Sequence, residues 1–117
     1  MTRAHSNGGI EMTIDELIVA FRRAVTRGYT RGSWSDRKGE PVVGILTERG
    51  LWNPTVLARL QSAARSDYLP RPSDVIGELL GIDRDAAWII YMVWNRNLDQ
   101  EEVVRALEEL KRGRRPP

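Results

Sequence analysis

The chain has 117 residues, of which 41% are hydrophobic and 29% charged, and its formal net charge is +2. These values are typical of one globular domain, and the longest apolar run, Ala86 to Trp94, is far shorter than the about 20 residues that span a bilayer, so no membrane association is expected. The absence of cysteine excludes disulfides, thiolate catalysis and cysteine-bound zinc, and it fits a cytoplasmic protein.

The predicted elements begin after a leader. Residues 1–12 lack the apolar stretch of a secretory signal, and we expect them to be flexible. A capping-box pattern starts at Thr13, and apolar residues at helical spacing follow it. Gly28 supplies a residue that tolerates the left-handed conformation in which helices end. The sequence therefore predicts a helix over 13–27.

The next segment is the one place where strands are expected. Residues 29–43 mix Gly, Ser and Asp with Tyr29 and Trp34, a composition that predicts a small β-hairpin or an ordered loop. Residues 42–47 then form an apolar run that is too short for its period to separate a helix from a buried strand. Both readings of this run stay open, although Pro41 suits the first position of a helix.

Two further helices are predicted in the middle of the chain. Asn53 followed by Pro54 is typical of a helix start, and the apolar stripe after it indicates a helix over 54–66. Ser73 is expected to cap the stretch DVIGELL, and Gly81 to end it. The two prolines of YLPRPSD make a continuous helix through this region unfavourable.

The last part of the chain reads as two helices with a join between them. Asp83 is expected to cap a helix that ends at Trp94, and Asn95 to take the left-handed conformation or to bond freed carbonyls. Asp99 should cap the final helix, and Gly113 should end it. The chain is thus expected to form a mainly α fold.

The expected organisation has three parts. Residues 13–112 form a single compact helical domain of five or six short helices, with the small β-hairpin or ordered loop near 29–43. Residues 1–12 are the flexible leader, and residues 113–117 form a disordered basic tail.

Catalytic constellations are not apparent. His5 is the only histidine and lies in the leader, so a nucleophile would lack its base. No glycine-rich phosphate loop is present. Several carboxylate pairs lie near predicted helix ends or on solvent faces, which suits the helix dipole better than acid–base chemistry. We therefore expect a non-enzymatic protein and predict no catalytic, metal or cofactor-binding residue.

Residues 74–94 have the spacing of a helix-turn-helix, with a small residue at Gly77 and a turn at Gly81. The start of the second helix would face DNA. Its exposed residues would be Asp85, Ala86, Trp88 and Ile89. None of them is suited to bidentate base contacts, and only the neighbouring Arg84 is usable. A DNA-binding regulator is therefore the alternative hypothesis, and nucleic acid is disfavoured as a partner.

A candidate partner surface lies around the end of the first helix. Trp34 sits in a polar segment close to arginines, and Trp and Arg are the residues that dominate protein interfaces. The predicted partner-binding residues are Arg23, Arg27, Tyr29, Arg31 and Trp34. The opposing interpretation, with Trp34 folded onto the core, has equal weight. The leading hypothesis is a small cytoplasmic binding or regulatory module for a protein partner. The sequence leaves open the identity of that partner and the oligomeric state.

Two stretches, WSDRKGEPVVGIL and VWNRNLDQEEVVRAL, carry a family resemblance. Together they resemble small uncharacterised domains found in actinobacteria and their phages, over about residues 13–110. The matching positions are Trp34, Gly39, Gly44, Trp94, Asn95, Glu102 and Val103. The family pattern has Cys where Pro41 and Val42 lie, and Asp where Arg96 lies. The resemblance implies a phage or prophage accessory protein that docks on a host protein, and it implies no reaction.

Overall fold

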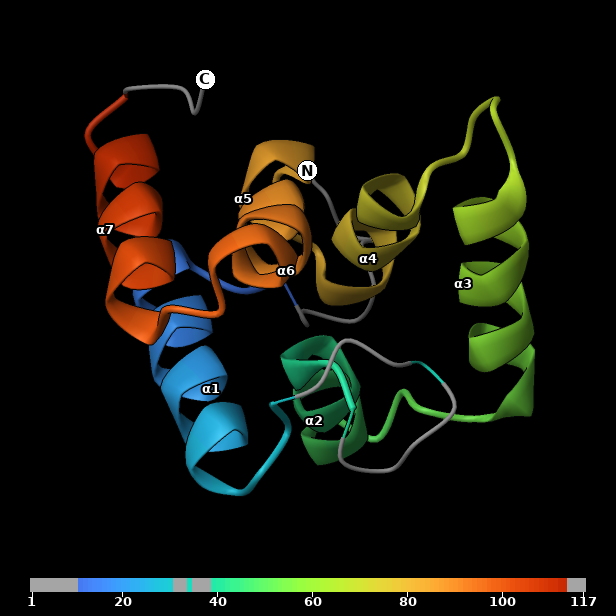
Figure 1. The fold of residues 1–117 in the computed structure, drawn as a ribbon, viewed down its shortest axis with the longest axis horizontal. Helices are drawn as coiled ribbons and strands as arrows, with labels where there is room; N and C mark the ends of the chain where they lie inside the picture. The colour runs from blue at the N-terminus through green and yellow to red at the C-terminus, as the bar shows by residue number, and fades with distance from the viewer. Residues whose placement is uncertain (1–10, 31–33, 35–38, 114–117) are drawn as a thin grey trace.

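The computed structural model describes residues 11–30, 34 and 39–113, and these residues form helices (Figure 1). The helices are α1 (Ile14–Thr26), α2 (Pro41–Glu48), α3 (Pro54–Arg65), α4 (Pro72–Leu80), α5 (Arg84–Trp88), the π-helical η2 (Ile89–Val93), α6 (Trp94–Asn97) and α7 (Gln100–Lys111). The predicted mainly α fold is confirmed. No strand occurs among the described residues, so the β-hairpin alternative for 29–43 is not supported, and residues 31–33 and 35–38 of this segment lie outside the described residues. Pro41 instead begins α2, which settles the 42–47 run as helix.

Most helix starts follow local capping, as predicted. The Thr13 hydroxyl accepts a hydrogen bond from the Glu16 amide, and the Thr13 amide donates one to the Glu16 carboxylate. Both halves of the capping box therefore form. The Asn53 side chain accepts from the Val56 amide at 2.9 Å, directly ahead of Pro54 at the first position of α3. Such short-range bonds need no tertiary contact, which is why the sequence predicts them well.

α4 starts two residues earlier than predicted, at Pro72 rather than Asp74. Pro72 occupies its first position, and the carboxylate of Asp74 accepts a hydrogen bond from the Arg71 amide at 2.9 Å. Ser73, predicted as the cap, is instead inside the helix and buried. The carboxylate of Asp74, at the third position of α4, thus binds the amide of the N-cap residue, as the acidic residue of a capping box does.

The predicted stop at Trp94–Asn95 is wrong. α5, η2 and α6 follow one another without a break from Arg84 to Asn97, and Leu98 rather than Asn95 takes the left-handed conformation, with φ of 51°. Asp99 then caps α7 as predicted, by accepting from the Glu101 amide at 3.0 Å. Asn95 therefore does not end the helix, and its side chain can interact with another part of the fold.

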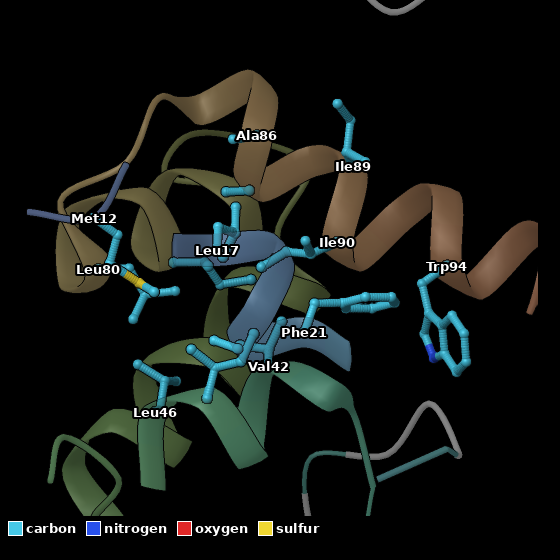
Figure 2. Close-up of a cluster of buried hydrophobic side chains, with 14 of the residues drawn as sticks. Met12, Leu17, Phe21, Val42, Leu46, Leu80, Ala86, Ile89, Ile90 and Trp94 are labelled. Carbon is cyan, nitrogen blue, oxygen red and sulfur yellow. The ribbon is translucent and has the colours of Figure 1, made fainter. Parts of the chain in front are cut away.

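The core lies between α1, α2, α4, η2 and α7. Figure 2 shows the part of it that α1, α2, α4, α5 and η2 enclose. Phe21 and Trp94 meet edge to face, with ring centroids 5.4 Å apart. Ile89 and Ile90 are both fully buried although they point to different sides of η2, so this helix is covered on more than one face. η2 therefore contacts solvent along only part of its circumference.

Met12 departs from the expected domain boundary. It was placed in the flexible leader, yet it belongs to the core and is only 9% exposed. Its neighbour Glu11 passes so close to the turn after α4 that a Cβ on Gly81 would lie 2.7 Å from the Glu11 Cα. Gly81 also has φ of 67°, which a glycine adopts without strain. The packed domain therefore begins before the first helix.

The first and last helices run antiparallel beside each other (Figure 1). Lys111, at the end of α7, binds Asp15 at the start of α1, at 2.9 Å. Arg22, near the end of α1, binds Glu101 at the start of α7, at 2.8 Å. These exposed pairs fix the direction of the two helices more than they add stability, because surface ion pairs contribute about 0–1 kcal/mol. Within the described residues no helix is long and apolar enough to cross a membrane.

Candidate functional site

The two predicted arginines of α1 converge on one carboxylate. Arg23 and Arg27 lie one helical turn apart and both donate to Glu48 of α2, at 2.9 and 3.2 Å. Their side chains are 47% and 57% exposed, whereas that of Glu48 is 25% exposed. Two positively charged side chains thus share one carboxylate at the end of α2. The three residues together carry a net positive charge.

The two aromatic residues of the predicted set lie against the core. Tyr29 is half-buried, and its ring occupies the space beside Gly44, where an added Cβ would lie 2.7 Å from the Tyr29 Cδ2. Trp34 is also half-buried and stacks on Tyr91 of η2, with centroids 5.2 Å apart. The structure therefore brings Arg23 and Arg27 together and gives the aromatic rings packing roles. Arg31 lies outside the described residues.

A surface depression lies next to the two arginines. It has a volume of about 640 Å³ and lies between α1 and α2. Its lining residues are Met12, Asp15, Glu16, Val19, Ala20, Arg23, Glu48 and Arg49. Val19 is 54% exposed, which makes it one of the few large hydrophobic side chains of the described residues that face solvent. Sequence reasoning missed Val19, although its signal was present as an apolar residue outside the buried stripe of the first helix.

The corner between α4 and α5 depends on two glycines, of which Gly81 takes the left-handed conformation at the end of α4. Gly77 lets the two helices approach, because a Cβ there would lie 3.0 Å from the Ile82 carbonyl oxygen. The surface of this corner is less suited to DNA. Arg84 lies 3.8 Å from Asp74, and the guanidinium of Arg96 lies over the ring of Trp88 at 5.4 Å.

Two of the side chains expected on the DNA-facing side of this corner are instead in the core. Ala86 is 1% exposed and Ile89 is fully buried. The side of this corner on which a recognition helix would contact bases is therefore packed into the core.

The most unusual group is a buried acid that sequence reasoning did not single out. Glu40, just before α2, is only 1% exposed. The side chain of Asn95 on α6 forms a hydrogen bond with its carboxylate, while Oε1 has no partner among the described residues. Burial raises the pKa of Glu40 to about 7, against the opposing effect of the Asn95 bond. The signal in the sequence was a glutamate directly before Pro41 and an apolar run.

Two neighbours of Glu40 share its unusual environment. Burial, and secondarily the charge of Glu40, raise the pKa of Tyr91. Trp94, next to Asn95, has its indole Nε1 buried with no acceptor among the described residues. Native proteins leave few buried polar atoms unpaired, which distinguishes this cluster from the rest of the described core.

Neither a metal site among the described residues nor a match to a known protein indicates a function. Within the described residues no group of three His, Cys, Asp or Glu side chains is arranged to hold a metal ion. A scan against protein-family models and searches of the curated proteins and of the solved structures found no match.

Proposed function

We propose that this chain is a small cytoplasmic protein-docking module without enzymatic activity, and that its docking surface is the depression between α1 and α2. The observation that carries the proposal is the 54% exposure of Val19 beside a hollow of about 640 Å³. Met12 and Ala20 add apolar surface to the same hollow. Exposed apolar side chains at a groove between helices are typical of surfaces that receive a helix from another protein.

The charges around the hollow define the occupant. Glu48 neutralises only one of the two guanidinium groups of Arg23 and Arg27, so a partner with carboxylates is favoured at this end. The proposed occupant is an amphipathic helix of a second protein, with an apolar residue over Val19 and acidic residues beside Arg23 and Arg27. Because the sequence resembles domains from phages and actinobacteria, we seek that partner among host-cell proteins.

DNA binding is the second candidate, and the corner between α4 and α5 favours it. Gly77 and Gly81 give that corner the close approach and the tight turn of a helix-turn-helix. Its outward residues weaken the case, because Arg84 is close to Asp74 and the adjoining Asp85 repels phosphate. The groove between α1 and α2 therefore ranks first.

A photo-cross-linking side chain at position 19 would identify the partner, and matched variants would test the surface. The captured protein is purified, and its dissociation constant is measured by calorimetry for the native chain, for Val19→Asp and for Tyr68→Asp. Tyr68 is the control because it is another exposed hydrophobic residue, at 79%, in the loop before α4. We expect Val19→Asp to weaken binding at least about tenfold, a loss of about 1.4 kcal/mol, and Tyr68→Asp to leave it nearly unchanged.

Two results would reject the groove. One is equal binding by Val19→Asp and the native chain. The other is the absence of any cross-linked protein together with a shift of labelled duplex DNA that Arg84→Ala abolishes, which would put the DNA-binding candidate first.

A further inference from the structure

The loop between α3 and α4 exposes two neighbouring apolar side chains. Tyr68 is 79% exposed and Leu69 is 72% exposed, which makes them the two most exposed large hydrophobic residues of the described part of the chain. Every residue from 64 to 71 is exposed. A single exposed hydrophobic residue is common on protein surfaces, whereas two adjacent ones on a loop form a patch of the kind that marks an interaction site.

The backbone around Tyr68 is held in place by hydrogen bonds. The Ser66 hydroxyl accepts a hydrogen bond from the Tyr68 amide at 3.0 Å and donates one to the Tyr68 carbonyl oxygen at 3.1 Å. The other end of the loop is fixed at Arg71, whose amide donates to the Asp74 carboxylate. The loop therefore presents Tyr68 in a preorganised conformation, which lowers the entropy that is lost when a partner binds.

A hollow of about 540 Å³ lies beside this loop. It is lined mainly by small or apolar side chains of α3, α4 and the loop, among them Ala58, Ser62, Ala63, Leu69, Pro70 and Val75. Figure 1 shows α3 at the edge of the fold, beside α4 and on the side opposite α7. The side of α3 that carries Ala58 and Ser62 is exposed, so the hollow is open to a second molecule.

The apolar loop and the hollow form a self-complementary surface. They are adjacent, because Leu69 is exposed on the loop and also lines the hollow. In a pair related by a two-fold axis the same surface of both copies is in contact. The loop of each copy can then fill the hollow of the other. Two tyrosine side chains bury about 300–500 Å² of the roughly 1,000 Å² that a specific interface requires, and the exposed sides of α3 supply the remainder.

The charges beside the hollow favour the same pairing. Arg65 shares a face of α3 with Ala58 and Ser62, because it follows them by seven and three residues. The described residues contain no ion-pair partner for Arg65 or for Asp67, the neighbour of Tyr68. When Tyr68 of one copy enters the hollow of the other, Asp67 moves towards Arg65 of the second copy. Opposite charges therefore meet across the two-fold axis.

We propose that this surface is a self-association site: two copies of the chain pair about a two-fold axis, with Tyr68 of each copy in the hollow beside α3 of the other. The proposal is independent of the docking groove between α1 and α2, since the two hollows have no lining residue in common. A pair therefore leaves both grooves open and presents two of them to a partner.

Sedimentation equilibrium of the full chain tests the pairing. Because small interfaces are weak, the chain is measured from about 1 µM to about 500 µM. We expect the average mass to rise from 13.3 kDa towards twice that value. Tyr68→Asp should keep the chain monomeric, and so should Ser62→Trp, because the indole fills the hollow. The matched control is Val19→Asp, which alters the docking groove and should leave the pairing unchanged.

Each contrary outcome overturns the pairing. A native chain that stays monomeric at the highest concentration does so, and if Tyr68→Asp then abolishes capture of a different protein, the hollow receives that protein instead. Pairing that persists in a folded Tyr68→Asp variant also rejects the site. If circular dichroism shows that this variant is unfolded, pairing of native strength in Ser62→Trp rejects it. Loss of pairing in Val19→Asp would place the contact at the groove between α1 and α2.

Discussion

Replacing Glu40 with glutamine should change how the stability of this protein depends on pH. The substitution keeps the shape of a side chain that is 1% exposed and removes its ability to ionise. Burial raises the pKa of Glu40 from 4.5 to about 7. A difference of that size corresponds to about 3 kcal/mol between the protonation states, since each unit is worth about 1.36 kcal/mol.

The sign follows from proton linkage. Between pH 4.5 and 7 the folded chain binds more protons at Glu40 than the unfolded chain does, so the free energy of unfolding falls as the pH rises. The contribution is fully present below pH 4.5 and fully lost above about pH 7. For these two pKa values, about 2.5 kcal/mol of the loss falls between pH 5 and pH 8.

Urea unfolding followed by circular dichroism at pH 5 and pH 8 measures this difference directly. The native chain should lose about 2.5 kcal/mol more than Glu40→Gln over this interval. Comparing the two intervals removes any fixed penalty of the buried amide, and it cancels the titration of His5, which both proteins retain. Equal pH dependence in the two proteins would refute the reasoning.

Three further predictions concern packing, capping and the surface. Gly44→Ala places a Cβ 2.7 Å from the Tyr29 Cδ2 and should lower the free energy of unfolding by about 1–3 kcal/mol in urea titrations, with a smaller loss in a Tyr29→Leu background; equal losses in both backgrounds would contradict the contact. Asp99→Ala removes the hydrogen bond to the Glu101 amide and should reduce stability by about 0.5–2 kcal/mol, so an unaltered urea midpoint would show that this cap is inactive. Val19→Asp should shift stability by no more than about 0.5 kcal/mol, and a large drop in melting temperature would instead make Val19 part of the core.

Features that depend on adjacent residues were predictable from the sequence. Thr13, Asn53 and Asp99 cap their helices because their oxygens reach amides two or three residues ahead, whatever the rest of the chain does. Gly77 and Gly81 predicted the corner between α4 and α5 for a similar reason, since close approach and a left-handed turn both require a missing Cβ.

Features that depend on distant contacts were not predictable in this way. The helix expected to stop at Trp94 continues to Asn97, and the contact of Trp94 with Phe21 joins residues 73 positions apart in the sequence. Glu40 is buried in a fold in which α2 packs against α1 and η2, and no local rule places a carboxylate in a core. The same reason explains why the candidate docking surface differs from the predicted one. Trp34 stacks on Tyr91, whereas Val19 is 54% exposed.

The pairing of α1 with α7 constrains how the chain folds during synthesis. The two ion pairs that join these helices connect residues 79 and 96 positions apart in sequence. A ribosome adding about 5–20 residues per second takes roughly 5–20 seconds to make the intervening chain. Throughout that interval α1 has no α7 packed beside it. Nascent chains are therefore expected to gain protease resistance only after α7 has left the exit tunnel, as one late step.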